Sequence, residues 1–370
     1  MNAGHLSERL HRRMHRAADE AASQGFDALV IAPSPDLAYL TGYDPMPLER
    51  ATLLVLRADR PPAMVVPELE RPLAATSPAG ASIELIGWID GVDPYAVAAK
   101  LLPPDARVAV GDRCWSSHLL ALQAALPGTT FSPASPVIGR LRAIKDDDEL
   151  AALRRAARGA DESFRQICTT TFLGRREEEI AADLADLLVR NGHTSAEFTI
   201  VASGPNAASP HHEPGGRTIL PRDAVVMDFG GALGGYFSDT TRTVVVGEPA
   251  PGFEGVYETV RRAQMAACDA VRPGIEAQEV DRVARRIIAD AGLGEKFIHR
   301  TGHGIGLEVH EPPYIVEGNE WVLEAGTTFS VEPGVYLEHE FGVRIEDIVE
   351  VTTEGVERLN RSTRELQVVE

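Results

Sequence analysis

Two histidines stand seven residues apart in the stretch TGHGIGLEVHEPPYI, which runs from residue 301 to residue 315. Imidazoles bind metal ions and transfer protons, so the spacing of His303 and His310 decides whether both could serve one site. The three glycines of the stretch make a helix unfavourable, and an unbroken strand would place residues seven apart on opposite faces. The two rings can therefore share a site only if the backbone between them is irregular.

Two pairs of carboxylates offer partners for such a site. Asp228 and Asp239 lie in two strand-like segments that the loop GGALGG joins, so a hairpin could bring their side chains together. Glu332 and Glu346 sit among apolar residues of strand-like segments, where charged side chains are seldom buried without a partner. Each of the four could also be a solvated acid at the end or edge of a strand. Arg344 could form a plain salt bridge with Glu346.

Taken together, these residues predict a metal site with four carboxylates and one imidazole. Four negative charges would balance two divalent cations, and oxygen-rich ligation with one nitrogen favours Mn²⁺, with Co²⁺, Zn²⁺ or Fe²⁺ as alternatives. Two such ions about 3.5–4 Å apart can hold a hydroxide and polarise a carbonyl, which is the chemistry of amide hydrolysis. Spare histidines, such as the pair in SPHHEP, could then stabilise the oxyanion or the leaving amine. The predicted ligands are Asp228, Asp239, His303, Glu332 and Glu346.

Motifs for other chemistries are incomplete or absent in the sequence. Residues 228–230 match the DFG of protein kinases, but no VAIK lysine or HRD segment accompanies them. GHGIGL is not GxGxxG, and no GxxxxGK occurs, so phosphate binding has little support. HExxH and GxSxG are also missing, and the prolines that follow His310 forbid a zincin helix.

The composition describes a globular chain of 370 residues, of which 44% are hydrophobic. The net charge of −19 argues against nucleic acid as a partner, since phosphate backbones require a basic face. The N-terminus lacks the apolar core of a secretory signal, and no run approaches the roughly 18 apolar residues of a membrane span. Three scattered cysteines do not suggest a disulfide framework. We expect a cytoplasmic protein with no nucleic-acid or membrane partner.

Hydrophobic patterns divide the chain into two domains joined by a linker. Residues 1–135 predict a small α/β domain, residues 136–147 a linker, and residues 148–370 an α+β domain. An antiparallel sheet is expected in the second domain, because its helices fall between hairpins. The expected helices are 148–167, 180–188, 254–271 and 276–291, and the expected strands are 198–203, 224–229, 236–246, 327–333 and 342–351.

The motifs occur in an order that resembles the pita-bread metallopeptidases of peptidase family M24. That family includes the Xaa-Pro dipeptidases (prolidases), aminopeptidase P and methionine aminopeptidase. The motifs are MDFG, SDTTRT, GHGIGLEVHE, SVEPGVY and GVRIEDIVEV, and the resemblance covers residues 145–370. A weaker likeness of residues 1–135, including IAPSPDLAYLTGY, to the creatinase-type N-terminal domain favours the proline-specific members. The resemblance implies a C-terminal pita-bread (creatinase/aminopeptidase) fold, a smaller α/β creatinase-type N-terminal domain, and a homodimer.

The resemblance also implies how the predicted ligands share two metal ions. Asp228 would bind one ion, and Asp239 and Glu346 would bridge both. His303 and Glu332 would bind the other ion. Glu332 would in addition be catalytic, because it would carry a proton from the bridging water to the leaving nitrogen.

Four further residues receive roles from the same resemblance. His211 and His310 would be catalytic, since both would contact the substrate and stabilise the tetrahedral state. His299 and Arg344 would bind the substrate. These roles depend on the family motifs, because the spacing of the residues does not define them.

The function that the resemblance implies is hydrolysis of the Xaa-Pro bond, most simply in dipeptides, by a hydroxide that bridges the two metals. An Xaa-Pro amide lacks the N–H that ordinary peptidases bind. The substrates would be small peptides with proline at the second position. The alternatives are an Xaa-Pro aminopeptidase acting on longer peptides, a metal-dependent hydrolase of a non-peptide C–N bond, and a non-catalytic binding protein.

Overall fold

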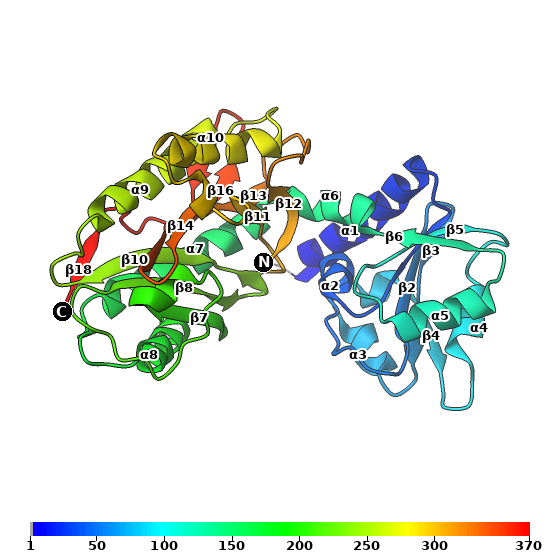
Figure 1. The fold of residues 1–370 in the computed structure, drawn as a ribbon. Helices are drawn as coiled ribbons and strands as arrows, with labels where there is room; N and C mark the ends of the chain where they lie inside the picture. The colour runs from blue at the N-terminus through cyan, green and yellow to red at the C-terminus, as the bar shows by residue number, and fades with distance from the viewer. Residues whose placement is uncertain (1–2) are drawn as a thin grey trace. The chain divides into compact units, whose positions relative to one another are not determined.

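The chain divides into two compact units, Met1–Arg142 and Ala143–Glu370, and the computed structural model describes residues 3–370 (Figure 1). The division falls inside segment 136–147, which the sequence analysis expected to be a linker. Most of that segment is helical, because it contains α6 (Ser135–Ala143) and the first residue of α7 (Asp147–Ile167). Among the described residues, no helix is both long and apolar enough to cross a bilayer.

Unit 1 is built on one mixed sheet of six strands in the order β4-β3-β2-β1-β5-β6. Strand β2 is antiparallel to both of its neighbours, whereas β1, β5 and β6 run parallel, as do β3 and β4. The strands are β1 (Ala28–Ile31), β2 (Leu53–Arg57), β3 (Arg60–Pro67), β4 (Glu84–Trp88), β5 (Arg107–Val110) and β6 (Thr130–Pro133). The other helices are α1 (Ala3–Ser23), α2 (Pro35–Thr41), α3 (Arg71–Thr76), α4 (Pro94–Ala99), α5 (Ser116–Ala125) and the short η1 (Gly80–Ser82).

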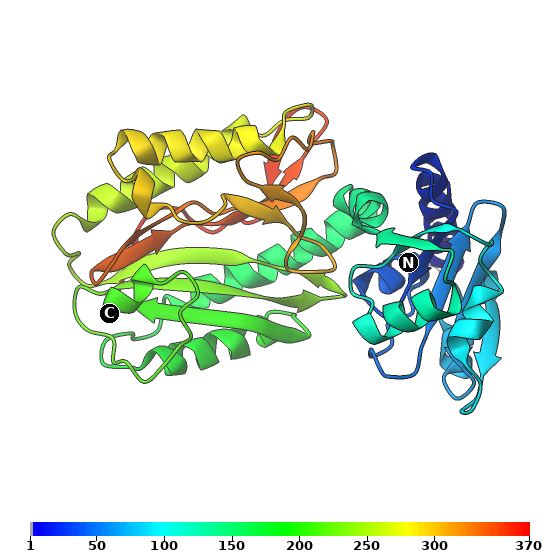
Figure 2. The same ribbon diagram turned by 45° about the vertical axis from the view of Figure 1, so that its right-hand side comes forward.

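Unit 2 contains two five-stranded sheets and two pairs of helices. One sheet has the order β18-β10-β8-β7, with β9 beside β8, and the other has the order β12-β11-β13-β16-β17. In Figure 2, helices α9 and α10 lie on one side of the strands and α8 lies on the other. The remaining helices are α8 (Glu177–Arg190), α9 (Phe253–Ala270), α10 (Ala277–Asp290), η2 (Gly204–Ala208) and η3 (Gly294–Lys296).

The strands of unit 2 are mostly antiparallel. The first sheet consists of β7 (Ser195–Ser203), β8 (Ala224–Leu233), β9 (Tyr236–Phe237), β10 (Thr240–Val246) and β18 (Gln367–Val369). The second consists of β11 (Gly302–Gly304), β12 (Glu311–Ile315), β13 (Thr328–Val331), β16 (Asp347–Val351) and β17 (Val356–Arg358). Strands β14 (Gly334–Leu337) and β15 (Phe341–Arg344) form a separate hairpin. The antiparallel sheet that the hairpin pattern predicted is thus present.

Helix α7 shows how the sequence defines an element. Asp146 and Glu149 form a reciprocal capping box at its N-terminus, and three acidic residues occupy the first turn, where the helix dipole favours them. The apolar residues at helical spacing, among them Leu153 and Phe164, are buried as the pattern predicted. Helices α7 and α8 share one core with β8 and β10, and α9 and α10 share another with β13, β15 and β16.

Two segments that the sequence analysis expected to be continuous strands are each broken in the middle. Segment 236–246 forms β9 and β10, with Ser238 and Asp239 between them, and segment 342–351 forms β15 and β16, with Ile345 and Glu346 between them. The second break arises because the chain changes partner from β14 to β13. At this point the amide of Glu346 donates to the carbonyl oxygen of Thr241 over 3.0 Å. Each break therefore places one acidic residue, Asp239 or Glu346, outside the regular pairing of the strands.

A buried ion pair ties the segment before α7 to the second sheet. Lys145 Nζ lies 2.8 Å from Glu311 Oε1, and the two side chains are 0% and 2% exposed. The backbone of Lys145 also donates to the carbonyl oxygen of Gly326. Glu311 is the first residue of β12 and directly follows His310, so the pair fixes the strand at which the candidate histidine emerges.

We expect Lys145→Met to lower the free energy of unfolding by about 3–5 kcal/mol, because it leaves the Glu311 carboxylate buried without its cation. Denaturant unfolding of the full chain would measure the change. Arg190→Met is the control, since among the described residues the Arg190 side chain forms only an exposed pair with Asp186, and its loss should change little. Similar small effects for both variants would contradict a structural role for the buried pair.

Candidate active site

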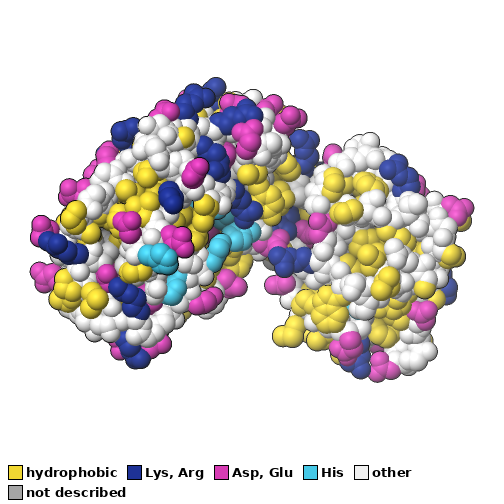
Figure 3. All heavy atoms as spheres, viewed as in Figure 1, with side chains coloured by type: hydrophobic (Ala, Val, Ile, Leu, Met, Phe, Trp, Pro, Cys, Tyr) yellow, Lys and Arg dark blue, Asp and Glu magenta, His cyan; other side chains and the backbone are white. Residues whose placement is uncertain are grey.

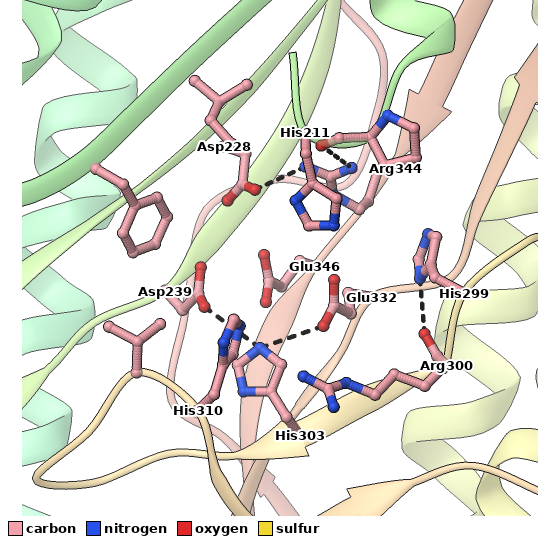
Figure 4. A pocket seen from close by; sticks show the side chains of 14 residues that line it. His211, Asp228, Asp239, His299, Arg300, His303, His310, Glu332, Arg344 and Glu346 are labelled. Atoms are coloured by element: carbon pink, nitrogen blue, oxygen red, sulfur yellow. Dashed lines mark hydrogen bonds and ion pairs between the residues drawn. The ribbon is translucent and has the colours of Figure 1, made fainter. Parts of the chain in front are cut away.

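A cavity of about 520 Å³ lies in unit 2, and the nine site residues that the sequence predicted all line it (Figure 4). Its size is that of a small-molecule site, for which about 300–1,000 Å³ is usual. Figure 3 shows histidine side chains gathered at one place on the surface of this unit. The nine residues are His211, Asp228, Asp239, His299, His303, His310, Glu332, Arg344 and Glu346, and the other lining residues are Phe198, Ile200, Pro210, Arg300 and Val309.

The carboxylates reach the cavity from strand ends and strand breaks. Asp228 in β8 pairs with Thr241, and Asp239 lies two residues before Thr241, so the two aspartates are diagonal neighbours on one face of the hairpin. Glu332 directly follows β13, and its amide donates to the carbonyl oxygen of Thr301 over 2.8 Å. Glu346 lies in the break between β15 and β16. The expected hairpin does bring Asp228 and Asp239 together, but the two residues are diagonal neighbours and do not face each other directly.

The backbone between His303 and His310 is irregular, as their spacing required. The register between β11 and β12 shifts after His303, and the two rings meet edge to face with centroids 4.1 Å apart. Glycine permits this packing: a Cβ on Gly302 would lie 1.8 Å from the carbonyl oxygen of Ser330, and one on Gly304 would lie 2.3 Å from that of Pro312. The glycines therefore allow the neighbouring strands to approach closely enough for both rings to line one cavity.

The ring of His303 is oriented by its own strand. Nδ1 lies 3.1 Å from the carbonyl oxygen of Gly304, so this nitrogen carries a proton and donates it to the carbonyl. Nε2 lies 3.3 Å from Glu332 Oε1 and 3.5 Å from Asp239 Oδ2. It can share a proton or a cation with these two carboxylates. A backbone carbonyl behind the ring is the usual support of a metal-binding histidine.

Arg344 is buried and its donors are engaged by neighbouring side chains. Its guanidinium donates to Asp228 Oδ2 over 2.7 Å, to the hydroxyl of Tyr336 over 2.8 Å, and through Nε to the hydroxyl of Thr241 over 3.0 Å. The Tyr336 hydroxyl lies 2.9 Å from His299 Nε2. Arg344 and His299 therefore belong to one network behind Asp228, and their role as substrate-binding residues stays a prediction.

Several lining residues were not predicted from the sequence. Phe198 and Ile200 alternate along β7, and Ile200 pairs with Asp228, so the period of two along FTIVAS was the signal that could have identified them. Arg300 also lines the cavity, and its guanidinium stacks on the ring of Tyr314 with 4.4 Å between Cζ and the ring centroid. No sequence pattern distinguished Arg300 from an ordinary surface arginine, because its partner lies on the neighbouring strand.

The sequence of residues 151–353 matches the model of metallopeptidase family M24, and residues 13–144 match the Creatinase/Prolidase N-terminal domain. The chain belongs to metallopeptidase family M24. The predicted fold class is confirmed, with a creatinase-type N-terminal domain followed by a pita-bread M24 domain. The family resemblance drawn from the motifs is confirmed as well.

Similar M24 proteins match almost the whole chain. The probable dipeptidase PepE of Mycobacterium bovis is 45% identical over 363 residues, which are 97% of this chain and 96% of the relative. The Xaa-Pro dipeptidase of Lactobacillus delbrueckii subsp. lactis is 37% identical over 356 residues, which are 93% and 95% of the two chains. The crystal structure of dipeptidase PepE from Mycobacterium ulcerans has a TM-score of 0.95 at 44% identity and covers 98% of both chains.

Membership in M24 implies divalent metal ions, and the donor set of this cavity fits them. Two carboxylate oxygens, Asp228 Oδ1 and Glu346 Oε1, are buried and accept no hydrogen bond from any residue within the described range 3–370. Buried polar atoms of this kind call for a partner. Three overlapping sets of ligand atoms lie within 4.8 Å of one another: Asp228, Asp239 and Glu346; His303, Glu332 and Glu346; and Asp239, His303 and His310.

The pKa values show that the carboxylates repel one another. Burial, together with the charges of Glu346 and Asp228, raises the pKa of Asp239 well above its usual value. Burial and the charges of Glu332 and Asp228 do the same to the pKa of Glu346. Burial is also the largest single influence on Glu332 and acts to raise its pKa, but the hydrogen bond and charge of His303, with the charges of His299 and Arg344, together outweigh it and lower the pKa to about 2. Cations would relieve this repulsion, so the electrostatics agree with the donor set.

We expect Asp239→Asn to have opposite effects with and without metal. In chelator, the variant loses one of four clustered charges, and its unfolding temperature should rise by about 2–4 °C, equivalent to about 1 kcal/mol. With added Mn²⁺, it should bind less metal than the parent protein and gain less stability. Thermal unfolding and elemental analysis of the metal content would measure both effects.

The exposed Asp186→Asn is the control and should change neither quantity. An Asp239→Asn protein that is less stable in chelator and keeps its full metal content would contradict this account of the cluster.

Proposed function

We propose that this M24 protein is a metal-dependent dipeptidase that hydrolyses the bond before proline in Xaa-Pro dipeptides. The observation that carries the proposal is the cluster of four carboxylates and His303 on the wall of one small cavity. The names of two relatives support it, since one is an Xaa-Pro dipeptidase and the other a probable dipeptidase. Mn²⁺ as the metal, a homodimer and a cytoplasmic location stay predictions.

The five predicted ligands, Asp228, Asp239, His303, Glu332 and Glu346, would hold two divalent cations. When bound, such ions activate a water molecule and polarise the scissile carbonyl. The carboxylates would fix the ions through their oxygens, and His303 would contribute Nε2, which its Nδ1 contact leaves directed at Glu332 and Asp239.

Glu332 is suited to move a proton between the water and the leaving nitrogen. In the metal-free protein its pKa of about 2 keeps its carboxylate ionised at neutral pH, and bound cations would likewise favour the ionised form that can accept a proton. The hydroxyl of Ser330 donates to Glu332 Oε1 over 3.0 Å and holds the carboxylate in place. The proton would then pass to the proline nitrogen, which becomes a secondary amine when the bond breaks.

His310 and His211 are the proposed donors to the substrate. The pKa of His310 is lowered to about 4, first by desolvation in the cavity wall and then by the nearby His303 and Arg300. Its ring is therefore neutral at neutral pH and can donate one N–H to the developing oxyanion. His211 lines the same cavity and would contact the substrate beside the scissile bond.

The other lining residues suit a proline substrate. Phe198, Ile200 and Val309 give the cavity an apolar wall, against which a pyrrolidine ring can be buried. The amide before proline has no N–H, and the proposed chemistry does not require one. The wall and the carboxylate cluster would therefore bind opposite sides of the scissile bond.

Arg300 favours a dipeptidase over an aminopeptidase. Its guanidinium makes no hydrogen bond or ion pair with any residue between positions 3 and 370, whereas the donors of Arg344 are engaged. Stacking on Tyr314 leaves the N–H edge of Arg300 free to bind a carboxylate. The proline of a dipeptide presents a carboxylate next to the scissile bond, and the proline of a longer peptide does not.

The proposed function is tested by hydrolysis of Ala-Pro, Leu-Pro and Ala-Pro-Ala in added Mn²⁺, with and without chelator. We expect the two dipeptides to be cleaved in Mn²⁺, the tripeptide to be cleaved poorly, and all cleavage to stop in chelator. Efficient cleavage of the tripeptide would select the aminopeptidase. Bound metal without cleavage of any peptide would exclude a peptidase and favour a hydrolase of another C–N bond.

We expect Arg300→Met to raise the KM for Ala-Pro by roughly 10- to 100-fold with little change in kcat, because hydrogen bonds to a charged carboxylate are lost. The C-terminal amide of Ala-Pro should be a poor substrate for the parent protein and equally poor for the variant. Arg165→Met, on the exposed face of α7, is the matched control. Equal losses on the acid and the amide would exclude Arg300 as the carboxylate receptor.

A further inference from the structure

A second buried carboxylate, outside the cavity, holds the loop that carries His211. Glu177 is the first residue of α8, and its side chain is fully buried. Its Oε1 accepts from the amide and the hydroxyl of Ser203, each over 2.7 Å, and from Asn206 Nδ2 over 3.0 Å. Its Oε2 lies 2.9 Å from His212 Nε2 and 3.4 Å from the amide nitrogen of Gly215. One carboxylate thus binds four points along a single segment, from the end of β7 through η2 to the loop beyond it.

The same segment supplies one wall of the cavity. Pro210 and His211 line the cavity, whereas the adjacent His212 turns away and binds Glu177. Figure 4 shows the His211 ring directed into the cavity near Asp228 and Arg344. The ring of His211 makes no hydrogen bond or ion pair with any residue in the part of the chain that the structure describes. Its position therefore depends on the backbone of the loop.

The sequence of the loop gives it little structure of its own. Segment 204–217 contains three glycines and three prolines, and apart from η2 it forms no regular element. Arg217 reinforces the anchor, because it donates to the Ser203 hydroxyl over 2.5 Å and to Asp223 Oδ2 over 2.6 Å. Without these side-chain contacts, the loop would sample many conformations and His211 would move with it.

The charge of Glu177 makes its hydrogen bonds strong. Burial raises the pKa of a carboxyl group, but at Glu177 the bonds from Ser203, His212 and Asn206 outweigh burial and lower the pKa below its usual value. The carboxylate is therefore ionised, and bonds to an ionised acceptor are about twice as strong as neutral ones. The side-chain amide of a glutamine at this position would also direct its NH₂ group toward N–H and O–H groups that are themselves hydrogen-bond donors.

We propose that Glu177 is a positioning residue that acts through segment 204–217 to hold His211 over the reacting bond. The proposal rests on the proposed function, because it takes His211 as the group that contacts the substrate. The observation that carries it is the pair of adjacent histidines, one of which lines the cavity while the other binds the buried carboxylate. Within the described residues, Glu177 neither lines the cavity nor makes a hydrogen bond or ion pair with a predicted metal ligand.

A double-mutant cycle separates this role from a general structural one. We expect Glu177→Gln to lower kcat for Ala-Pro by roughly 10- to 100-fold, as loss of a supporting residue does at other sites, with metal content unchanged. In a His211→Ala background, the same substitution should lower kcat less than about threefold, because the group that it positions is gone. Glu178→Gln is the matched control, since within residues 3–370 the side chain of the neighbouring Glu178 forms an ion pair only with Arg176, and the substitution leaves its backbone bond to Gly215 in place.

The outcomes of the cycle are distinct. If Glu177→Gln lowers kcat by the same factor in the parent protein and in His211→Ala, the proposal is overturned in favour of a general structural role. Full activity of Glu177→Gln would overturn it as well. Absence of activity in the parent protein would overturn the proposed function, and the positioning role is then decided by a measurement that needs no turnover.

That measurement is the ring resonance of His211 in protein labelled at its histidine carbons, with diamagnetic Zn²⁺ added. The resonance is assigned by its loss in His211→Ala. We expect it to shift and broaden in Glu177→Gln and to be unchanged in Glu178→Gln, and His212→Asn should reproduce part of the effect. An unchanged His211 resonance in Glu177→Gln would overturn the positioning role, whatever the substrate is.

Discussion

Mutual repulsion among four clustered carboxylates, two buried and two partly buried, is the constraint on which the rest of the catalytic unit depends. Two unit charges about 4 Å apart repel by about 4 kcal/mol at an effective dielectric constant near 20, so such a cluster cannot be assembled without compensation. Only Glu332 has a lowered pKa, whereas burial keeps the pKa of Asp228 raised despite its ion pair with Arg344, and the pKa values of Asp239 and Glu346 are raised further. The protein alone favours the ionised form of one carboxylate of the four, and the charges of the other three depend on cations. Metal binding and the stability of this unit are thereby coupled.

The fold holds the repelling groups by attaching each to a different piece of a rigid sheet. Asp228 extends from within β8, whereas Asp239, Glu332 and Glu346 lie at strand ends or breaks, and the amides of Glu332 and Glu346 donate to carbonyl oxygens of neighbouring segments. Two separate cores, one under each helix pair, support the two sheets. A carboxylate on a mobile loop would move away from its like-charged neighbours, and one within a packed sheet cannot. The sheets therefore keep the four like-charged carboxylates close together before metal binds.

Periodicity predicted most elements because the helices of unit 2 are amphipathic and its strands are apolar. It did not predict the breaks at Asp239 and Glu346. At Glu346 a change of strand partner leaves the alternation of side chains intact, and at Asp239 the segments on both sides pair with β8 in one register. The site residues could be named from family motifs, which encode contacts between distant segments. Arg300 and Glu177 could not, since their partners are ordinary residues far along the chain, and only the structure shows that one guanidinium is free and one carboxylate is fully bonded.

The two walls of the cavity differ in how they are held, and the difference matches their proposed tasks. His303 lies on β11, whose glycines let the neighbouring backbones pack closely, and His310 directly precedes β12, so the groups near the reacting bond are held by the sheet. His211 lies on an irregular loop that side-chain hydrogen bonds hold in place, and Arg300 stacks on a single tyrosine. A wall held by a few hydrogen bonds can be altered by single substitutions without disturbing the carboxylate cluster. Substrate preference can therefore change while the metal chemistry stays the same.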